Sequence, residues 1–164
     1  MAAAQDPPAY LRFPENEVAK GVDSFRASAA RGGMVQVARD IRTCLGTMSQ
    51  GAPADLVRQC FAFETAAFTV AMAHDARMRT APLPGLSRAG FSRRLDGYSA
   101  RMGVAVGDCP AARMSMSEQV SYRLGTSPAG LHRQYGYPAH LAWPCGGSGQ
   151  RPPLGRRLAK AEPF

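Results

Sequence analysis

The segment spanning residues 54–79 is apolar or small nearly all the way round when it is drawn as a helix. Phe61 and Phe68 widen an apolar side, and alanine and threonine continue around most of the remaining circumference. A helix without a broad polar face needs neighbours on several sides to exclude water from it. This segment therefore predicts a helical bundle in which residues 54–79 form the central helix.

Four other segments each carry one apolar stripe at helical spacing, the pattern of helices that pack onto a core from outside. They are predicted over residues 15–31, 34–48, 87–102 and 110–124. Gly32-Gly33 ends or hinges the first of them, and residues 49–53 supply a short turn after the second. Short connections make sequential helices antiparallel neighbours. The predicted fold class is all-α: a small up-and-down helical bundle of four to five helices with a central antiparallel helical hairpin.

The two ends of the chain differ in composition from the predicted helical domain, residues 15–125. Residues 1–14 are predicted to form an extended arm because their three prolines disfavour helix. Residues 126–164 contain six glycines and six prolines among 39 positions, which predicts a disordered C-terminal tail rich in Pro, Gly and Arg. The tail resembles an unselected translation of GC-rich DNA of the bacterial kind, and we hypothesise a frameshift or read-through near Gly125.

The opening Met-Ala-Ala-Ala-Gln-Asp-Pro-Pro resembles the end of a secretion signal followed by a mature start. The hypothesis is that the start codon is placed too late or that a leader has been removed, which predicts a periplasmic or secreted protein. Without such a leader the chain is expected in the cytoplasm. No run approaches the roughly 20 apolar residues of a membrane-spanning helix, so no transmembrane segment is predicted.

Four cysteines occur, and none of them forms a C-x-x-C pair of the thioredoxin or zinc-knuckle kind. Cys44 and Cys60 lie roughly 6 Å and 9 Å from the hairpin turn at 1.5 Å per residue, on stripes that face each other. They are therefore a candidate disulfide, which would stabilise the fold by about 3 kcal/mol. The alternative is a pair of reduced, buried cysteines in a cytosolic protein. Cys109 has no assigned role, and Cys145 is interpreted as a free thiol in the tail.

The net charge of +8 is unevenly distributed along the chain. Residues 1–76 carry seven basic and eight acidic side chains, whereas residues 77–164 carry thirteen and four. Such asymmetry is typical of a surface for nucleic acid or another polyanion, although a solvated basic face gives the same pattern. The candidate phosphate or anion contacts are six arginines between residues 77 and 101: Arg77, Arg79, Arg88, Arg93, Arg94 and Arg101.

No signature of nucleotide binding, of a hydrolase elbow or of a zinc protease occurs in the chain. His74 is expected to be a core residue, and Glu64 is expected at a helix rim facing solvent. The spacing of His132, His140 and Cys145 matches no compact zinc pattern. The sequence therefore predicts no catalytic residue, no metal site and no cofactor.

These observations favour a noncatalytic helical protein that acts through contacts with a protein partner or as a small exported domain. Two partner faces are expected: the small-residue side of residues 54–79, and the arginine-bearing side of the helix that starts near Ser87. The alternative is a basic nucleic-acid-binding protein that uses the arginine-rich region 77–101.

Overall fold

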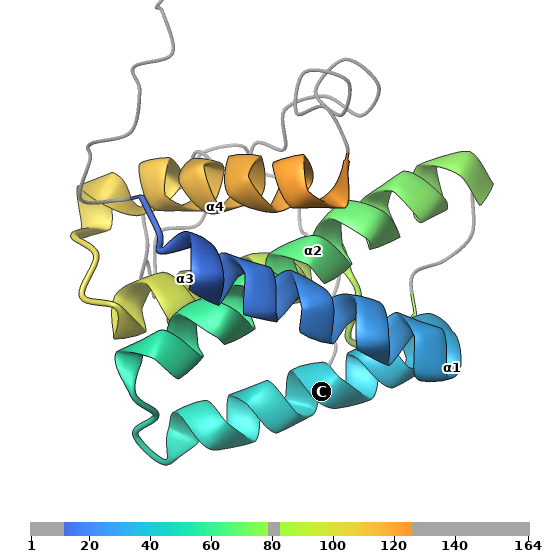
Figure 1. Cartoon of the computed structure of the whole chain (residues 1–164), viewed down its shortest axis with the longest axis horizontal. Helices are drawn as coiled ribbons and strands as arrows, with labels where there is room; N and C mark the ends of the chain where they lie inside the picture. Colours follow the sequence, from blue (N-terminus) through green and yellow to red (C-terminus); the bar gives the residue numbers. More distant parts are fainter. Residues whose placement is uncertain (1–11, 79–82, 126–164) are drawn as a thin grey trace, which may run out of the picture.

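The computed structural model describes residues 12–78 and 83–125, and in these ranges the chain is a bundle of α-helices without strands (Figure 1). The elements in order are α1 (Glu15–Ser49), α2 (Ala54–Met78), α3 (Arg88–Arg101), the short 3-10 helix η2 (Val106–Asp108) and α4 (Cys109–Leu124). The predicted all-α bundle is confirmed. No helix within the described ranges is long and apolar enough to cross a membrane.

Helix α1 consists of two halves that meet at a sharp break. Gly32 (φ −162°, ψ 23°) and Gly33 (φ 63°, ψ −158°) leave the helical conformation, and the positive φ of Gly33 is one that glycine adopts without strain. The second half, residues 34–49, folds back beside the first (Figure 1). We call it the arm. The predicted hinge is confirmed, because the two expected helices form the two sides of one bend.

Asp40 on the arm holds this bend by bonding to both sides of it. Its carboxylate accepts hydrogen bonds from Ser28 (2.6 Å) and Arg31 (2.9 Å) before the break and from Gln36 (2.9 Å) after it. Burial works against ionisation, but the Ser28 and Gln36 hydrogen bonds and the Arg31 charge together lower the pKa of Asp40. The bend is therefore fixed by an ionised carboxylate at neutral pH.

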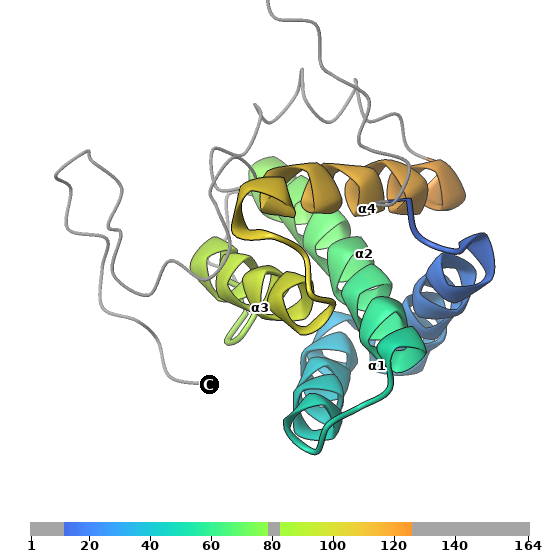
Figure 2. The same ribbon diagram turned by 90° about the vertical axis from the view of Figure 1, so that its left-hand side faces the viewer.

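Helix α2 is the centre of the bundle, with α1, α3 and α4 around it (Figure 2). All residues from Cys60 to Thr69 are buried, including the alanines and threonines of this stretch. Gly21 of α1 permits a close approach, because a Cβ atom there would lie 2.5 Å from the Gln59 carbonyl oxygen and 2.6 Å from the Cβ of Ala62. The expectation that the small-residue side of this helix is a partner face is thus wrong for this stretch, because the side is already packed by neighbouring helices.

The apolar stripes predicted for the outer helices face this centre. Val18, Val22, Val37, Ile41, Phe91, Leu95, Met116 and Val120 are all nearly or completely excluded from solvent. Aromatic contacts link the layers: Phe61 packs edge-on against Phe13 at 5.7 Å, and Phe68 packs against Phe91 at 5.0 Å. Burial of these side chains is the main source of stability of such a bundle.

Residues 12–14 precede α1 without regular secondary structure, and Pro14 has φ −56° and ψ 127°. The side chain of Gln119 on α4 forms two hydrogen bonds with the backbone of Phe13. Its amide nitrogen donates to the Phe13 carbonyl oxygen (2.8 Å), and its amide oxygen accepts from the Phe13 N–H (3.1 Å). This contact places the Phe13 ring in the core, at 7% exposure. Residues 1–11 and 126–164, on which the arm and tail predictions fall, lie outside the described ranges.

Candidate functional site

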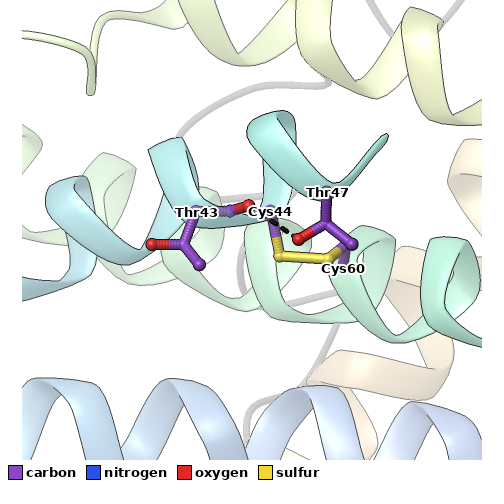
Figure 3. The surroundings of a disulfide bond; sticks show 4 residues. All are labelled: Thr43, Cys44, Thr47 and Cys60. Carbon is purple, nitrogen blue, oxygen red and sulfur yellow. Dashed lines mark hydrogen bonds between the residues drawn. A yellow bond between two sulfur atoms is a disulfide. The ribbon is translucent and has the colours of Figure 1, made fainter. Parts of the chain in front are cut away.

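The predicted cysteine pair is joined. Cys44 on the arm and Cys60 on α2 form a disulfide with a Cα–Cα distance of 5.9 Å, within the usual span of this bond (Figure 3). The reason is the one the spacing indicated: both residues lie on facing stripes of an antiparallel hairpin, at similar distances from its turn. The disulfide closes a loop with a sequence separation of 16.

A hollow of about 330 Å³ lies over this disulfide, between the two halves of α1 and the start of α2. Both cysteines line it, together with the apolar side chains of Ala27, Leu56 and Phe63. Cys44 is partly exposed, whereas Cys60 is only 4% exposed. Of the two cysteines, the one on the arm is therefore the more accessible to solvent.

The polar groups around the hollow do not converge on a reacting position. Thr43 and Thr47 stand beside the disulfide, and the Thr47 hydroxyl donates to the Thr43 carbonyl oxygen at 3.0 Å (Figure 3). Arg31 and Asp40 at its edge are paired with each other at 2.9 Å. A nucleophile, a general base and an oxyanion donor within reach of one point are what acyl-transfer chemistry needs, and this lining offers no such set.

Two buried charged groups form a second cluster between α2 and α3. Glu64 is completely buried and forms an ion pair with Arg94, which is 7% exposed. Arg94 also donates to the Gly85 carbonyl oxygen at 2.8 Å and lies over the Phe91 ring at 5.0 Å. Two expectations are wrong here: Glu64 does not face solvent, and Arg94 is not a surface arginine. The reason is that the two side chains neutralise each other across the helix interface.

This environment changes the ionisation of Glu64. Burial raises the pKa of Glu64 to about 7, and the Arg94 charge and the Tyr98 hydroxyl only partly oppose that rise. Burial also raises the pKa of Tyr98, and the nearby Glu64 carboxylate adds to the effect. Neither the Glu64 Oε2 atom nor the Tyr98 hydroxyl has a well-formed hydrogen bond within the described part of the chain. Glu64 is therefore the carboxyl group whose protonation changes near neutral pH.

A second ion pair connects α3 to α4. Arg113 is 1% exposed and pairs with Asp96, whose side chain is 27% exposed. Burial lowers the pKa of Arg113 to about 10. Both arginine pairs act as links between helices, because each joins side chains of two different helices inside the bundle.

The six predicted anion contacts divide into three groups. Arg94 is internal, Arg93 and Arg101 are exposed on α3, and the side chains of Arg77, Arg79 and Arg88 lie outside the described part. Arg93 and Arg101 have no ion pair within residues 12–78 and 83–125, and they share the exposed face of α3 with three small residues. That face, which we call the α3 face, consists of Ala89, Arg93, Gly97, Ala100 and Arg101.

The other candidate residues are not brought together. The His74 side chain is not described, and His132, His140 and Cys145 lie outside the described ranges. Cys109 is fully buried at the start of α4 and is itself disulfide-bonded. No group of three side chains able to ligate a metal occurs within the described residues.

Sequence reasoning missed the Glu64–Arg94 pair, although one signal pointed to it. Glu64 interrupts a segment that is otherwise apolar or small on every side, so a buried position was the consistent assignment. Asp40 and Gln119 gave no such signal, because each lies among polar neighbours in the sequence and finds its partners only in the folded chain.

Comparison with protein-family models, with curated proteins and with solved structures finds no match to this chain.

Proposed function

We propose that this chain is a noncatalytic helical domain of an oxidising compartment that acts by binding another protein through the α3 face. The observation that carries the proposal is the Cys44–Cys60 disulfide between the arm and α2. Disulfides form in periplasmic, secreted and lumenal proteins and are rare where glutathione and thioredoxin keep thiols reduced. The charged groups of the interior support a noncatalytic role, because they are used in pairs that link helices.

The α3 face supports a protein partner with an acidic surface. Arg93 and Arg101 are eight residues apart, which places them on one side of α3 and roughly 12 Å apart along its axis. Ala89, Gly97 and Ala100 fill the same face with small side chains, so that another backbone can approach closely. Exposed arginines such as these are suited to carboxylates because the guanidinium donates two parallel hydrogen bonds.

Photo-crosslinking in the native host tests this proposal. A photoreactive amino acid replaces Gly97, where a Cβ atom would meet no atom within 4 Å. Gly46 on the arm is the matched control, since it is also exposed and equally open. We expect one defined protein adduct at position 97, absent at position 46 and lost when Arg93→Glu is added. Equal adducts at both positions, or none at 97, would contradict a partner site on α3.

Nucleic-acid binding through the region 77–101 is the alternative, and the two exposed arginines Arg93 and Arg101 are the observation in its favour. Arg94 is buried, which weakens the case for nucleic-acid binding, because affinity for nucleic acid rises with the number of phosphates that the protein neutralises. A nuclease-sensitive adduct at Gly97, together with binding to DNA that falls steeply between about 50 and 200 mM salt, would favour this alternative over a protein partner.

A further inference from the structure

The arm is held to the bundle by fewer buried side chains than the rest of α1. Its buried residues are Val37, Ile41 and Met48, whereas the first half buries Glu17, Val18, Gly21, Val22, Phe25 and Ser28. Figure 2 shows the arm at the edge of the bundle, on the side of α2 away from α4. Elements with few buried contacts open at lower free energy than the core, so the arm is the first candidate for local opening.

Two specific interactions hold the arm against the rest of the bundle. At the bend, Asp40 connects the arm to Ser28 and Arg31. Near its other end, the Cys44–Cys60 disulfide fixes it covalently to α2. The bend is also where the backbone can move, because Gly32 and Gly33 are already outside the helical conformation. Loss of the disulfide leaves the arm held by Asp40, by its three buried side chains and by the partly buried Met34, Ala38 and Leu45.

The hollow brings this bond within reach of a reductant. It is lined by both cysteines and is open to solvent, and the exposed residues Ser24 and Thr43 are among its lining. Cys44 is the more exposed partner, and Cys60 is 4% exposed. Thiol–disulfide exchange depends on access and on which sulfur is attacked. The geometry therefore directs an incoming thiolate to Cys44.

We propose that the Cys44–Cys60 disulfide is a thiol-reducible switch that decides whether the arm is held against α2. The thiolate of a low-molecular-weight thiol attacks Sγ of Cys44, the Cys44–Cys60 bond breaks, and Cys60 leaves with the electron pair as a thiolate. A second thiolate of the same class then attacks the reductant's sulfur in the mixed disulfide and releases Cys44 as a thiolate. The reductant is oxidised to its disulfide, and the protein has gained two electrons. This inference does not depend on a partner at the α3 face.

Reduction kinetics of the full chain test the first half of the proposal, with dithiothreitol as the probe. Direct attack on the folded protein predicts a reduction rate at this disulfide that rises linearly with dithiothreitol concentration. With glutathione in place of dithiothreitol, rapid acid quenching and peptide mapping are expected to find the mixed disulfide on Cys44. A rate that reaches a plateau at the global unfolding rate, or glutathione attached to Cys60, would overturn the proposal.

Hydrogen exchange tests the second half. After reduction we expect amides of residues 34–49 to exchange about tenfold faster or more, while those of residues 88–101, a helix without cysteine, change less than about twofold. The double variant Cys44→Ser/Cys60→Ser is the control for the other disulfide of the chain: its arm exchanges fast without dithiothreitol and does not respond to it. Equal acceleration in every helix, or no change in the arm, refutes the switch. Should the double variant not fold, the wild-type kinetics and exchange decide alone.

Discussion

Removing one member of the buried Glu64–Arg94 pair breaks an ion pair in the centre of the bundle. Both side chains are almost fully excluded from solvent, Glu64 at 0% and Arg94 at 7% exposure. Breaking such a pair typically costs about 3 to 5 kcal/mol, whereas replacing both members by apolar residues of similar volume is often close to neutral. Domains of this size have total stabilities of about 5 to 15 kcal/mol, so a single replacement removes a large part of the total.

The two single variants are expected to differ in a defined direction. Arg94→Met leaves Glu64, which escapes the buried charge by taking up a proton, since its pKa is already raised to about 7. Glu64→Met takes away the carboxylate that faces the buried Arg94 guanidinium. Glu64→Met is therefore expected to lower the free energy of unfolding by about 3 to 5 kcal/mol, and Arg94→Met by less.

Urea denaturation of the wild type, both single variants and the Glu64→Met/Arg94→Met double variant measures this as a thermodynamic cycle. The double variant is expected within about 1 kcal/mol of the wild type, which gives a large favourable coupling between the two positions. A double variant that loses the sum of the two single losses, or single variants that each lose less than about 1 kcal/mol, would refute the reasoning that the two charges compensate each other.

The contacts of Glu64, Gln119 and Gly21 predict three other outcomes. Burial raises the pKa of Glu64 to about 7 against an ordinary value of 4.5, so the stability that comes from its protonated form is present below pH 4.5 and is lost as the pH rises to 7. Urea denaturation across this range should show a fall in the free energy of unfolding of the wild type that Glu64→Gln lacks. Gln119→Ala removes both hydrogen bonds to the Phe13 backbone and is expected to lower the free energy of unfolding by about 1 to 3 kcal/mol. The Phe13 amide should then exchange its hydrogen faster, and unchanged exchange there would contradict the contact. Gly21→Ala places a methyl group against the α2 backbone, so it should lower the thermal midpoint, at a cost of about 1 to 3 kcal/mol of stability. In the control Gly46→Ala the new methyl group meets nothing within 4 Å, so it should raise stability by about 0.5 to 1 kcal/mol.

Helical periodicity identified the elements because the packing of each helix is decided by one face of its own sequence. The stripe through Val37 and Ile41 predicts a buried side regardless of what covers it, and the structure covers it with α2. The disulfide could also be predicted from the sequence, because a hairpin with a short turn places residues that are equally far from the turn side by side. Cys44 and Cys60 satisfy this condition.

Contacts that depend on how nonsequential elements meet could not be predicted in the same way. Glu64 and Arg94 are 30 residues apart, and their pairing requires the relative rotation of α2 and α3. Phe13 and Gln119 are 106 residues apart, and their contact requires the extended segment before α1 to cross α4. Apolar spacing specifies which side of a helix is buried but not which charged side chains will find each other at the interface.

Peptide mapping of the nonreduced protein from its native host tests the central claim that the oxidised hairpin is the working form. Trypsin cleaves the segment between the two cysteines at Arg58, so Cys44 lies in peptide 43–58 and Cys60 in peptide 59–77. After alkylation without reductant, we predict that these two peptides appear as one disulfide-linked species that separates on reduction. Recovery of both peptides singly, each with an alkylated cysteine, would contradict the oxidised hairpin and the oxidising compartment inferred from it.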